Sequence, residues 1–341
     1  MSGYHIGIDL GGTKIEIAAF DPEGTQIYQL RVPTPQKDYE KTLNEVCNLV
    51  TECQNQLGPA NCVGIATPGA QSLLTGLMKN CNSTCLNNKP FKSDLQARLE
   101  LSVRMANDAD CFTLSEAIDG AGSNLKGTIH EVLKGTIHEV LNEELVESVN
   151  ELVTEPLIVY GVILGTGVGG GIVYDKKLLQ GVNRISGEWG HNPMPHFSVR
   201  ETNSDANSIF KRPRRCYCGK ENCIETYLSG PSLAADFHHL TGDELKAEEI
   251  VQQALQGDLN AEKVLDFYCD NLARALASVI NILDPHVIVM GGGLSNIQSL
   301  YSIVPSIWGK YVFSDEVRTR LVPPEYGDSS GVRGAAWLCV D

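Results

Sequence analysis

The chain has 341 residues, of which 42% are hydrophobic and 20% are charged, and its net charge at pH 7 is −15. This length allows two packed lobes, while the acidic balance argues against a nucleic-acid partner, which usually meets a basic surface. Because no apolar run approaches the ~20 residues that span a bilayer, and the N-terminus lacks a signal-peptide core, we expect a cytoplasmic protein without a membrane partner.

The first 116 residues alternate short apolar strands with amphipathic helices, which predicts a small N-terminal α/β lobe at 1–116. The predicted strands are at 5–9, 15–20, 26–32, 62–66 and 102–106, and the predicted helices are at 38–57 and 92–100. The polar residues at 107–110 then cap the following helix.

The rest of the chain predicts a larger lobe at 117–324. Its elements are strands at 157–164, 172–174 and 286–290, a glycine run at 165–171 and a long helix at 261–283, and a terminal helix follows at 331–338. The eight residues at 125–132 are repeated directly at 133–140. Two copies are too few for a repeat architecture, so we interpret 124–156 as a surface insertion.

Three glycine-rich segments follow predicted strands. Glycine lets backbone N–H groups approach phosphate oxygens, so the segments at 9–14 and 165–171 are candidate phosphate loops, with Asp9 placed to hold Mg²⁺ through water. At 291–293 the backbone could pass close to a flat base. Each segment alone could equally be a tight turn, because isolated glycine motifs are weak evidence. Together they are typical of the actin-like ATPase (ribonuclease H-like) fold, in which two lobes with mixed sheets hold a nucleotide in a cleft.

Polar residues in two places are candidates for binding and deprotonating a hydroxyl group. Asp108 follows a predicted strand, where its carboxylate could accept the proton of an attacking hydroxyl, although Asn107 and Asp108 could equally form an ordinary helix cap. Glu188, His191 and Glu225 carry groups that match vicinal sugar hydroxyls. Glu188 and His191 could also be a surface acid and a structural histidine.

Three of the 11 cysteines, Cys216, Cys218 and Cys223, lie within eight residues, and His191 lies 25 residues before the first of them. Thiolates and imidazole are the ligands of structural zinc, which takes four of them in a tetrahedron. A disulfide is a poor alternative in a cytoplasmic protein, and we expect most of the other cysteines to be small buried hydrophobic residues. The cluster therefore predicts a closed zinc site that holds the loop carrying Glu188 and Glu225.

In order, spacing and type, these motifs resemble those of the ROK family (repressor, open reading frame, kinase). The matching segments are 9–14, 107–108, 165–171, 187–191, 216–225 and 291–293, which extend over nearly the whole chain apart from the insertion. Within the family, the segments at 75–84, 187–195, 216–226, 281–293 and 327–338 look like those of the bacterial manno(fructo)kinases. The resemblance implies transfer of the ATP γ-phosphoryl group to the 6-hydroxyl of a hexose, with fructose as the leading substrate.

The same resemblance implies roles for individual residues. Asp108 would be the catalytic base. The hexose would be bound by Gly69, Asn82, Asn107, Glu188, His191 and Glu225. ATP and Mg²⁺ would be bound by Asp9, Gly11, Gly12, Thr13, Lys14, Gly165, Thr166, Gly167, Gly291, Gly292 and Gly293. Zinc would be held by His191, Cys216, Cys218 and Cys223. The resemblance also implies that 325–341 packs on the N-terminal lobe, and that the protein is a homodimer.

Other functions remain open. Relatives that phosphorylate N-acetylated hexosamines share the zinc and acid motifs, so the sequence also allows an N-acetylglucosamine kinase or a glucokinase. ROK transcriptional regulators carry a helix-turn-helix segment before the first phosphate loop, whereas only eight residues precede Asp9 here, which disfavours that class. The presence of Asp108 and of both phosphate loops disfavours a catalytically inactive sugar sensor.

Overall fold

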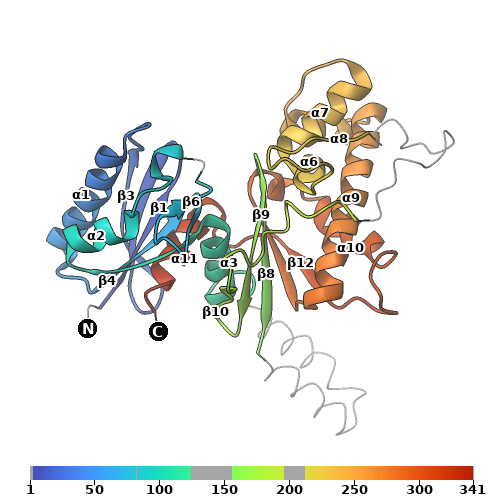
Figure 1. Ribbon diagram of the computed structural model, residues 1–341. Coiled ribbons are helices and arrows are strands. Elements are labelled where there is room, and N and C mark those ends of the chain that lie inside the picture. Colours follow the sequence, from blue (N-terminus) through green and yellow to red (C-terminus); the bar gives the residue numbers. More distant parts are fainter. Residues whose placement is uncertain (1–2, 82, 124–155, 196–211, 341) are drawn as a thin grey trace, which may run out of the picture. The chain divides into compact units, whose positions relative to one another are not determined.

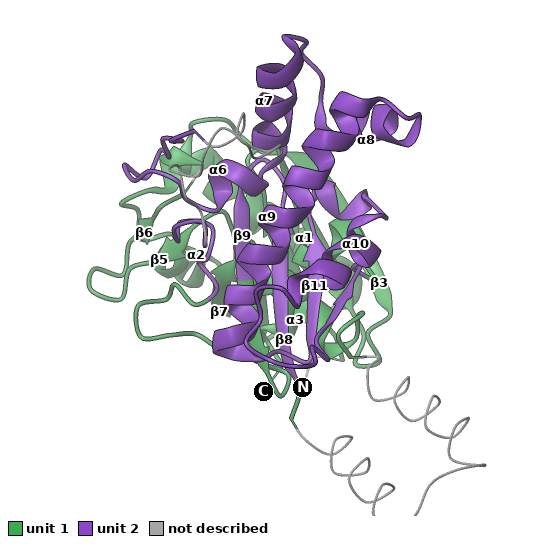
Figure 2. Ribbon diagram, turned by 90° about the vertical axis from the view of Figure 1, so that its right-hand side faces the viewer, with its two compact units in different colours: residues 1–157, 171–186, 325–341 green, residues 158–170, 187–324 purple. Residues whose placement is uncertain are grey.

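The computed structural model describes residues 3–81, 83–123, 156–195 and 212–340. Asn82 and nearly all of the predicted insertion at 124–156 lie outside these described residues. The chain divides into two compact α/β units, which Figure 2 colours separately. Unit 1 comprises Met1–Leu157, Gly171–Ser186 and Glu325–Asp341, and unit 2 comprises Ile158–Gly170 and Gly187–Pro324. The sequence predicted boundaries after residues 116 and 324, whereas in this division residues 117–157 and 171–186 also belong to unit 1.

Unit 1 is built on a five-stranded sheet with the order β3-β2-β1-β4-β7 (Figure 1). The strands are β1 (His5–Leu10), β2 (Lys14–Phe20), β3 (Gln26–Pro33), β4 (Cys62–Thr67) and β7 (Ser102–Asn107). The first three strands are antiparallel, whereas β4 and β7 run parallel to β1. The parallel strands end at one edge of the sheet, where Asp9 pairs with Ala66 and Thr67 pairs with Asn107.

Helices cover both faces of this sheet (Figure 1). They are α1 (Tyr39–Leu57), α2 (Phe91–Leu99), α3 (Asp108–Ile118) and α11 (Ser330–Trp337), with the 3₁₀ turns η1 (Thr84–Leu86) and η4 (Gly327–Ser329) and a small ribbon of β5 (Ala70–Gln71) and β6 (Met78–Lys79). Strand residues alternate between the faces, so Ile6 and Ile8 pack in the core with α1 while Gly7 faces α11. A Cβ at Gly7 would collide with the backbone of Val332, which explains how the terminal helix can lie directly on the sheet.

The second sheet has the order β10-β9-β8-β11-β12. Its strands are β8 (Ile158–Leu164), β9 (Val168–Tyr174), β10 (Lys177–Leu178), β11 (Val287–Gly291) and β12 (Arg320–Val322), and β8, β11 and β12 are parallel. The strand predicted at 172–174 begins at Val168, so most of the glycine run is strand rather than turn. Close packing explains these glycines, because a Cβ at Gly170 would lie 2.8 Å from the Tyr160 hydroxyl and one at Gly171 would lie 2.6 Å from that of Thr113.

The remaining helices of unit 2 pack around the long helix α9, as Figure 1 shows. The central helix is α9 (Leu259–Leu283), and the helices around it are α6 (Glu225–Leu228), α7 (Gly230–Thr241), α8 (Ala247–Leu255) and α10 (Leu300–Trp308). The 3₁₀ turn η3 (Gly293–Asn296) follows β11. The helix predicted at 261–283 is therefore confirmed. Among the residues that the structure describes, no helix is long and apolar enough to cross a membrane.

Half of the eight cysteines outside the predicted zinc cluster are buried, whereas most of them were expected to be. Cys53, Cys81, Cys111 and Cys269 are buried. Cys62 and Cys339, however, form a disulfide that joins the start of β4 to the residues after α11. The sequence analysis did not anticipate this bond, because the two residues are 277 positions apart and nothing in the local sequence pairs them.

Candidate functional site

The glycine turn of unit 1 joins β1 to β2 and is held from outside by side chains. The N–H of Gly11 donates to the carbonyl of Lys14 over 3.0 Å, and a Cβ at Gly11 would lie only 2.9 Å from that oxygen. The Thr34 hydroxyl donates to the Gly11 carbonyl over 2.8 Å, and the Gln36 amide donates to the Gly12 carbonyl over 2.7 Å. These hydrogen bonds hold the turn while Gly12 and Thr13 remain exposed at its tip.

Two carboxylates lie at the same sheet edge, because Asp9 is near the end of β1 and Asp108 directly follows β7. Desolvation, together with the negative charges of Asp108 and Glu16, raises the pKa of Asp9 to about 6. Desolvation also raises the pKa of Asp108, and the Ala109 N–H, which donates to its carboxylate over 2.8 Å, opposes this rise. A cation beside Asp9 would relieve the repulsion, and a raised pKa makes Asp108 a better proton acceptor.

Asn107 is the N-cap of α3, as the alternative interpretation predicted. Its side-chain oxygen accepts a hydrogen bond from the Asp110 N–H over 2.6 Å. This cap fixes the start of the helix and therefore the position of Asp108, its first residue.

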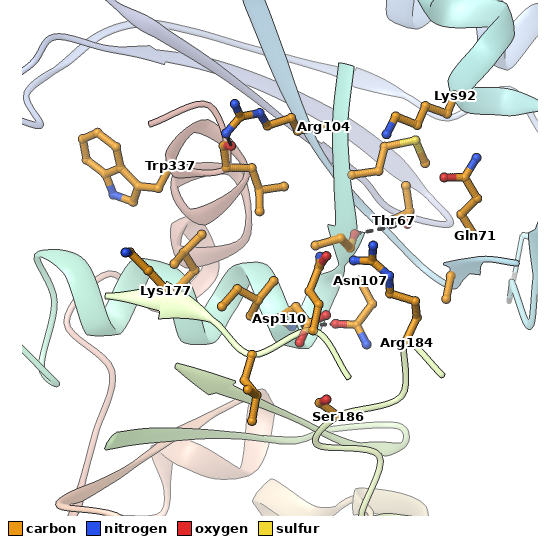
Figure 3. A pocket seen from close by; sticks show the side chains of 18 of the residues that line it. Thr67, Gln71, Lys92, Arg104, Asn107, Asp110, Lys177, Arg184, Ser186 and Trp337 are labelled. Atoms are coloured by element: carbon orange, nitrogen blue, oxygen red, sulfur yellow. Dashed lines mark hydrogen bonds between the residues drawn. The ribbon is translucent and has the colours of Figure 1, made fainter. Parts of the chain in front are cut away.

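A cavity of about 380 Å³ opens beside Asn107 within unit 1. Gly69 also lines it, and the loop there requires glycine, because a Cβ would lie 2.6 Å from the Cys81 thiol. Figure 3 shows Gln71, Lys92 and Arg184 around the cavity. The sequence analysis did not identify these three residues, because they belong to no motif.

The structure brings the nucleotide candidates of unit 2 together. The Gly230 N–H at the start of α7 donates to the Gly165 carbonyl over 2.8 Å. Gly292 has a φ of 81°, and a Cβ there would collide with the backbone of Leu164. The start of α7 therefore contacts the glycine turn at 165–167. The segment at 291–293 lies against the end of β8, the strand that precedes this turn. Gly230 was missed, although the Ser229 cap and Pro231 are typical signals of a helix start.

Glu225 links this turn to the zinc loop. Its carboxylate accepts a hydrogen bond from the Val168 N–H over 3.0 Å, and a Cβ at Gly167 would lie 2.9 Å from the same oxygen. Its own N–H donates to the Gly190 carbonyl over 2.9 Å. Glu225 thus connects the second glycine turn with the segment at 187–191.

The segment at 187–191 packs tightly on the start of β9. The buried Trp189 donates its indole N–H to the Gly169 carbonyl over 2.9 Å, and a Cβ at Gly190 would collide with the carbonyl of Val168. These contacts leave Glu188 exposed beside the buried tryptophan.

His191, Cys216, Cys218 and Cys223 form one cluster whose ligand atoms all lie within 4.8 Å of one another. The Cys216 sulfur is 3.5 Å from Nδ1 of His191, and the sulfurs of Cys218 and Cys223 are 3.6 Å apart. Ligand atoms about 2.1–2.3 Å from a tetrahedral zinc are roughly 3.5–3.8 Å from each other. The donor set and its spacing therefore fit the predicted structural zinc.

Tyr217 completes this cluster and was not identified from the sequence. Its hydroxyl lies 3.0 Å from Nε2 of His191. If Nδ1 held a zinc ion, Nε2 would carry the proton and donate to that oxygen, which would fix the orientation of the ring. A sugar hydroxyl at Nε2 would therefore have to share or replace the Tyr217 contact.

Comparisons with known proteins agree with the motifs. Residues 5–138 and 136–341 match the model of the ROK family. The chain is 35% identical to an N-acetyl-D-glucosamine kinase of Vibrio atlanticus, over 98% of this chain and 99% of that one. It is 36% identical to an N-acetyl-D-glucosamine kinase of Salmonella gallinarum, over 98% of both chains.

Solved structures show the same fold. A ROK hexokinase from Thermus thermophilus matches 98% of this chain and 97% of its own, with a TM-score of 0.76 and 23% identity. A ROK family glucokinase from Streptomyces griseus, in complex with glucose and AMPPNP, matches 98% of both chains with a TM-score of 0.67 and 23% identity. The predicted actin-like ATPase fold is thereby confirmed. The chain belongs to the ROK family, and within it to the sugar kinases.

Proposed function

We propose that this protein is an ATP-dependent N-acetyl-D-glucosamine kinase. The observation that carries the proposal is the 35% and 36% identity to N-acetyl-D-glucosamine kinases over nearly the full length of both chains. The sequence analysis favoured fructose and kept N-acetylglucosamine as an alternative. These relatives support the alternative better than fructose. The zinc and acid motifs that led to the family do not decide between the two substrates, because they are common to both substrate classes.

In the proposed reaction, Asp108 accepts the proton of the attacking sugar hydroxyl. The oxygen of that hydroxyl forms a bond to the γ-phosphorus of ATP, while the bond from this phosphorus to the bridging oxygen breaks and its electron pair leaves with ADP. The raised pKa of Asp108 suits a base that takes up a proton and later releases it to solvent.

Three glycine segments are proposed to bind ATP. In unit 1 the turn at 11–14, and in unit 2 the turn at 165–167, are proposed to offer backbone N–H groups to phosphate oxygens, and Gly291, Gly292 and Gly293 of unit 2 to accommodate the base. Asp9 would hold Mg²⁺, which neutralises phosphate charge during the transfer.

The hexose is proposed to contact Gly69, Asn82, Asn107, Glu188, His191 and Glu225. The zinc cluster supports this role indirectly. It fixes His191, and Glu225 is hydrogen-bonded to the segment that carries Glu188.

The test is ADP release from Mg-ATP with N-acetylglucosamine, N-acetylmannosamine, glucose, mannose and fructose. We expect kcat/KM to be highest on N-acetylglucosamine and to fall about 10²–10⁴-fold in Asp108→Asn. Turnover that is strongest on fructose would overturn the substrate but keep the kinase. Near-normal turnover of Asp108→Asn would overturn the assigned base.

A further inference from the structure

Unit 2 contains a cavity of about 380 Å³ beside its glycine turn. Thr166 of the turn lines one part of it, the segment at 212–217 lines another, and residues of α6 and α7 complete it. Thr166 is a proposed phosphate contact and Glu225, which also lines the cavity, is a proposed sugar contact. The basic segment at 212–215 has no part in the function described so far.

Positive charge is in excess around this cavity, although the whole chain is acidic. Arg212 and Arg214 both contact the same oxygen of Asp236, at 3.2 Å and 2.7 Å. Arg214 is buried, stacks 4.0 Å from the centre of the Tyr227 ring, and serves the packing of unit 2. One carboxylate thus faces two guanidinium groups. Within the described residues, Nη1 of Arg212 is buried without a hydrogen-bond acceptor.

Arg215 adds a third guanidinium to the lining. Its backbone is fixed by a β-bridge to Glu221, and the next residue is the zinc ligand Cys216. Its side chain is exposed and forms no ion pair or hydrogen bond within the part of the chain that the structure describes. The other lining carboxylate, Glu225, already accepts the Val168 N–H.

The first turn of α7 also reaches this cavity, but its N–H groups are already used. Gly230 donates to Gly165 over 2.8 Å, and the Ser232 N–H donates to the Ser229 hydroxyl over 3.3 Å. The first turn of α7 therefore offers no free N–H group to an anion, and the cationic donors of the lining, apart from the packed Arg214, are the guanidinium groups of Arg212 and Arg215.

We propose that Arg212 and Arg215 bind a phosphoryl group in this cavity. The proposal rests on the proposed function, in which the nucleotide and the product sugar phosphate both carry such a group. Two guanidinium groups with free N–H donors match the oxygens of a phosphoryl group, which accepts bidentate hydrogen bonds. Pro213, Tyr217 and Pro231 also line the cavity, and their uncharged side chains suit contact with the organic part of the ligand.

The test compares wild type, Arg215→Ala, Arg215→Lys and Arg212→Gln in calorimetric binding of pyrophosphate, ADP and N-acetylglucosamine 6-phosphate at low salt. Arg318→Ala is the matched control, because Arg318 is an exposed arginine of the same unit that pairs with Glu316 at 2.8 Å. We expect Arg215→Ala and Arg212→Gln to weaken binding about tenfold, as the loss of a charge-assisted hydrogen bond predicts. Arg215→Lys should recover part of the loss, and Arg318→Ala should bind like wild type.

The ligands separate the two sources of the phosphoryl group. A loss confined to ADP and pyrophosphate assigns the cavity to the nucleotide, and a loss confined to the sugar phosphate assigns it to the product. Unchanged affinity of folded Arg215→Ala and Arg212→Gln for all three ligands overturns the proposal, with folding verified by an unchanged Tm. Arginine-dependent pyrophosphate binding without turnover of any hexose would keep this site and overturn the proposed function. Turnover of N-acetylglucosamine with arginine-independent binding would keep the proposed function and overturn this site.

Discussion

The two glycine turns have similar sequences but are held in different ways. In unit 1, the hydroxyl of Thr34 and the amide of Gln36 hold the turn from the chain beyond β3. In unit 2, the carboxylate of Glu225 and the backbone of α7 hold it, and Glu225 directly follows the zinc loop. The unit 1 turn is thus held by side chains just beyond β3, whereas the unit 2 turn is held by α7 and by a residue that follows the His/Cys cluster in sequence.

Removal of zinc should have the largest effect of all the predicted changes. Structural zinc contributes about 10–16 kcal/mol of apparent binding free energy in zinc-finger peptides, so chelation or Cys216→Ser should lower the Tm strongly. Hexose affinity should fall more than ATP affinity, because His191 belongs to the proposed zinc cluster while the glycine turn keeps its contact with α7. Calorimetry of the chelated protein with each ligand measures the affinity for the hexose and the affinity for ATP.

Cys47→Ser is the control for this experiment, since Cys47 is a half-buried cysteine of α1 outside the cluster. An unchanged Tm after metal removal, verified by elemental analysis, would contradict the structural role of the zinc.

Within each turn, one glycine should be required and its neighbour should tolerate alanine. A Cβ at Gly167 would lie 2.9 Å from the Glu225 carboxylate, whereas one at Gly165 would meet nothing within 4 Å. Similarly, a Cβ at Gly11 would lie 2.9 Å from the Lys14 carbonyl, whereas the nearest atom to one at Gly12 is 3.8 Å away. We expect Gly167→Ala and Gly11→Ala to cost about 1–3 kcal/mol of unfolding free energy.

Gly165→Ala and Gly12→Ala are the matched controls and should unfold close to wild type in urea. Equal destabilisation by both alanines of one turn would show that backbone freedom, rather than the close contact, is what the glycines provide there.

Local patterns in the sequence predicted the strands, the long helices and the residues of the His/Cys cluster well. The cysteine spacing led to the cluster because zinc has a fixed ligand number and geometry, and the Asn107 cap could be recognised because α3 begins immediately after it. Both features could be predicted because they depend only on the order and spacing of residues in the chain.

Long-range contacts could not be predicted in this way. Tyr217 on His191, Thr34 on the first turn and Arg212 on Asp236 each join residues from separate elements, and no local pattern links their partners. The strand at 168–171 was missed for a similar reason, because glycine disfavours strands and only the close packing of β9 explains its presence there. The substrate could not be predicted from the sequence either, because the motifs that define the family are common to kinases of different hexoses.

The paired carboxylates of unit 1 predict a pH dependence that unit 2 should not share. Because the folded pKa of Asp9, about 6, lies above its unfolded value, the folded state binds the extra proton and Asp9 destabilises the protein as pH rises through 6. Asp9→Asn should therefore raise the Tm of the ligand-free protein at pH 7–8, and this gain should vanish below about pH 4. Mg²⁺-dependent binding of ATP should strengthen in wild type between pH 5 and 7, as the carboxylate ionises. A gain in Tm that persisted unchanged at low pH would show that packing, rather than charge, destabilises Asp9.

The smallest expected effect comes from the hydroxyl that holds the unit 1 turn. Thr34→Val keeps the shape of a buried side chain but removes the hydrogen bond to Gly11, which should cost about 1 kcal/mol. Thr51→Val is the matched control, because the Thr51 hydroxyl also donates to a backbone carbonyl, that of Cys47, but lies on an exposed face of α1. If the Thr34 contact shapes the phosphate turn, Thr34→Val raises the KM for Mg-ATP a few-fold while the KM for the hexose stays constant. A rise in both KM values, or an equal rise in Thr51→Val, would show that the substitution acts through general stability and that the turn does not depend on this clamp.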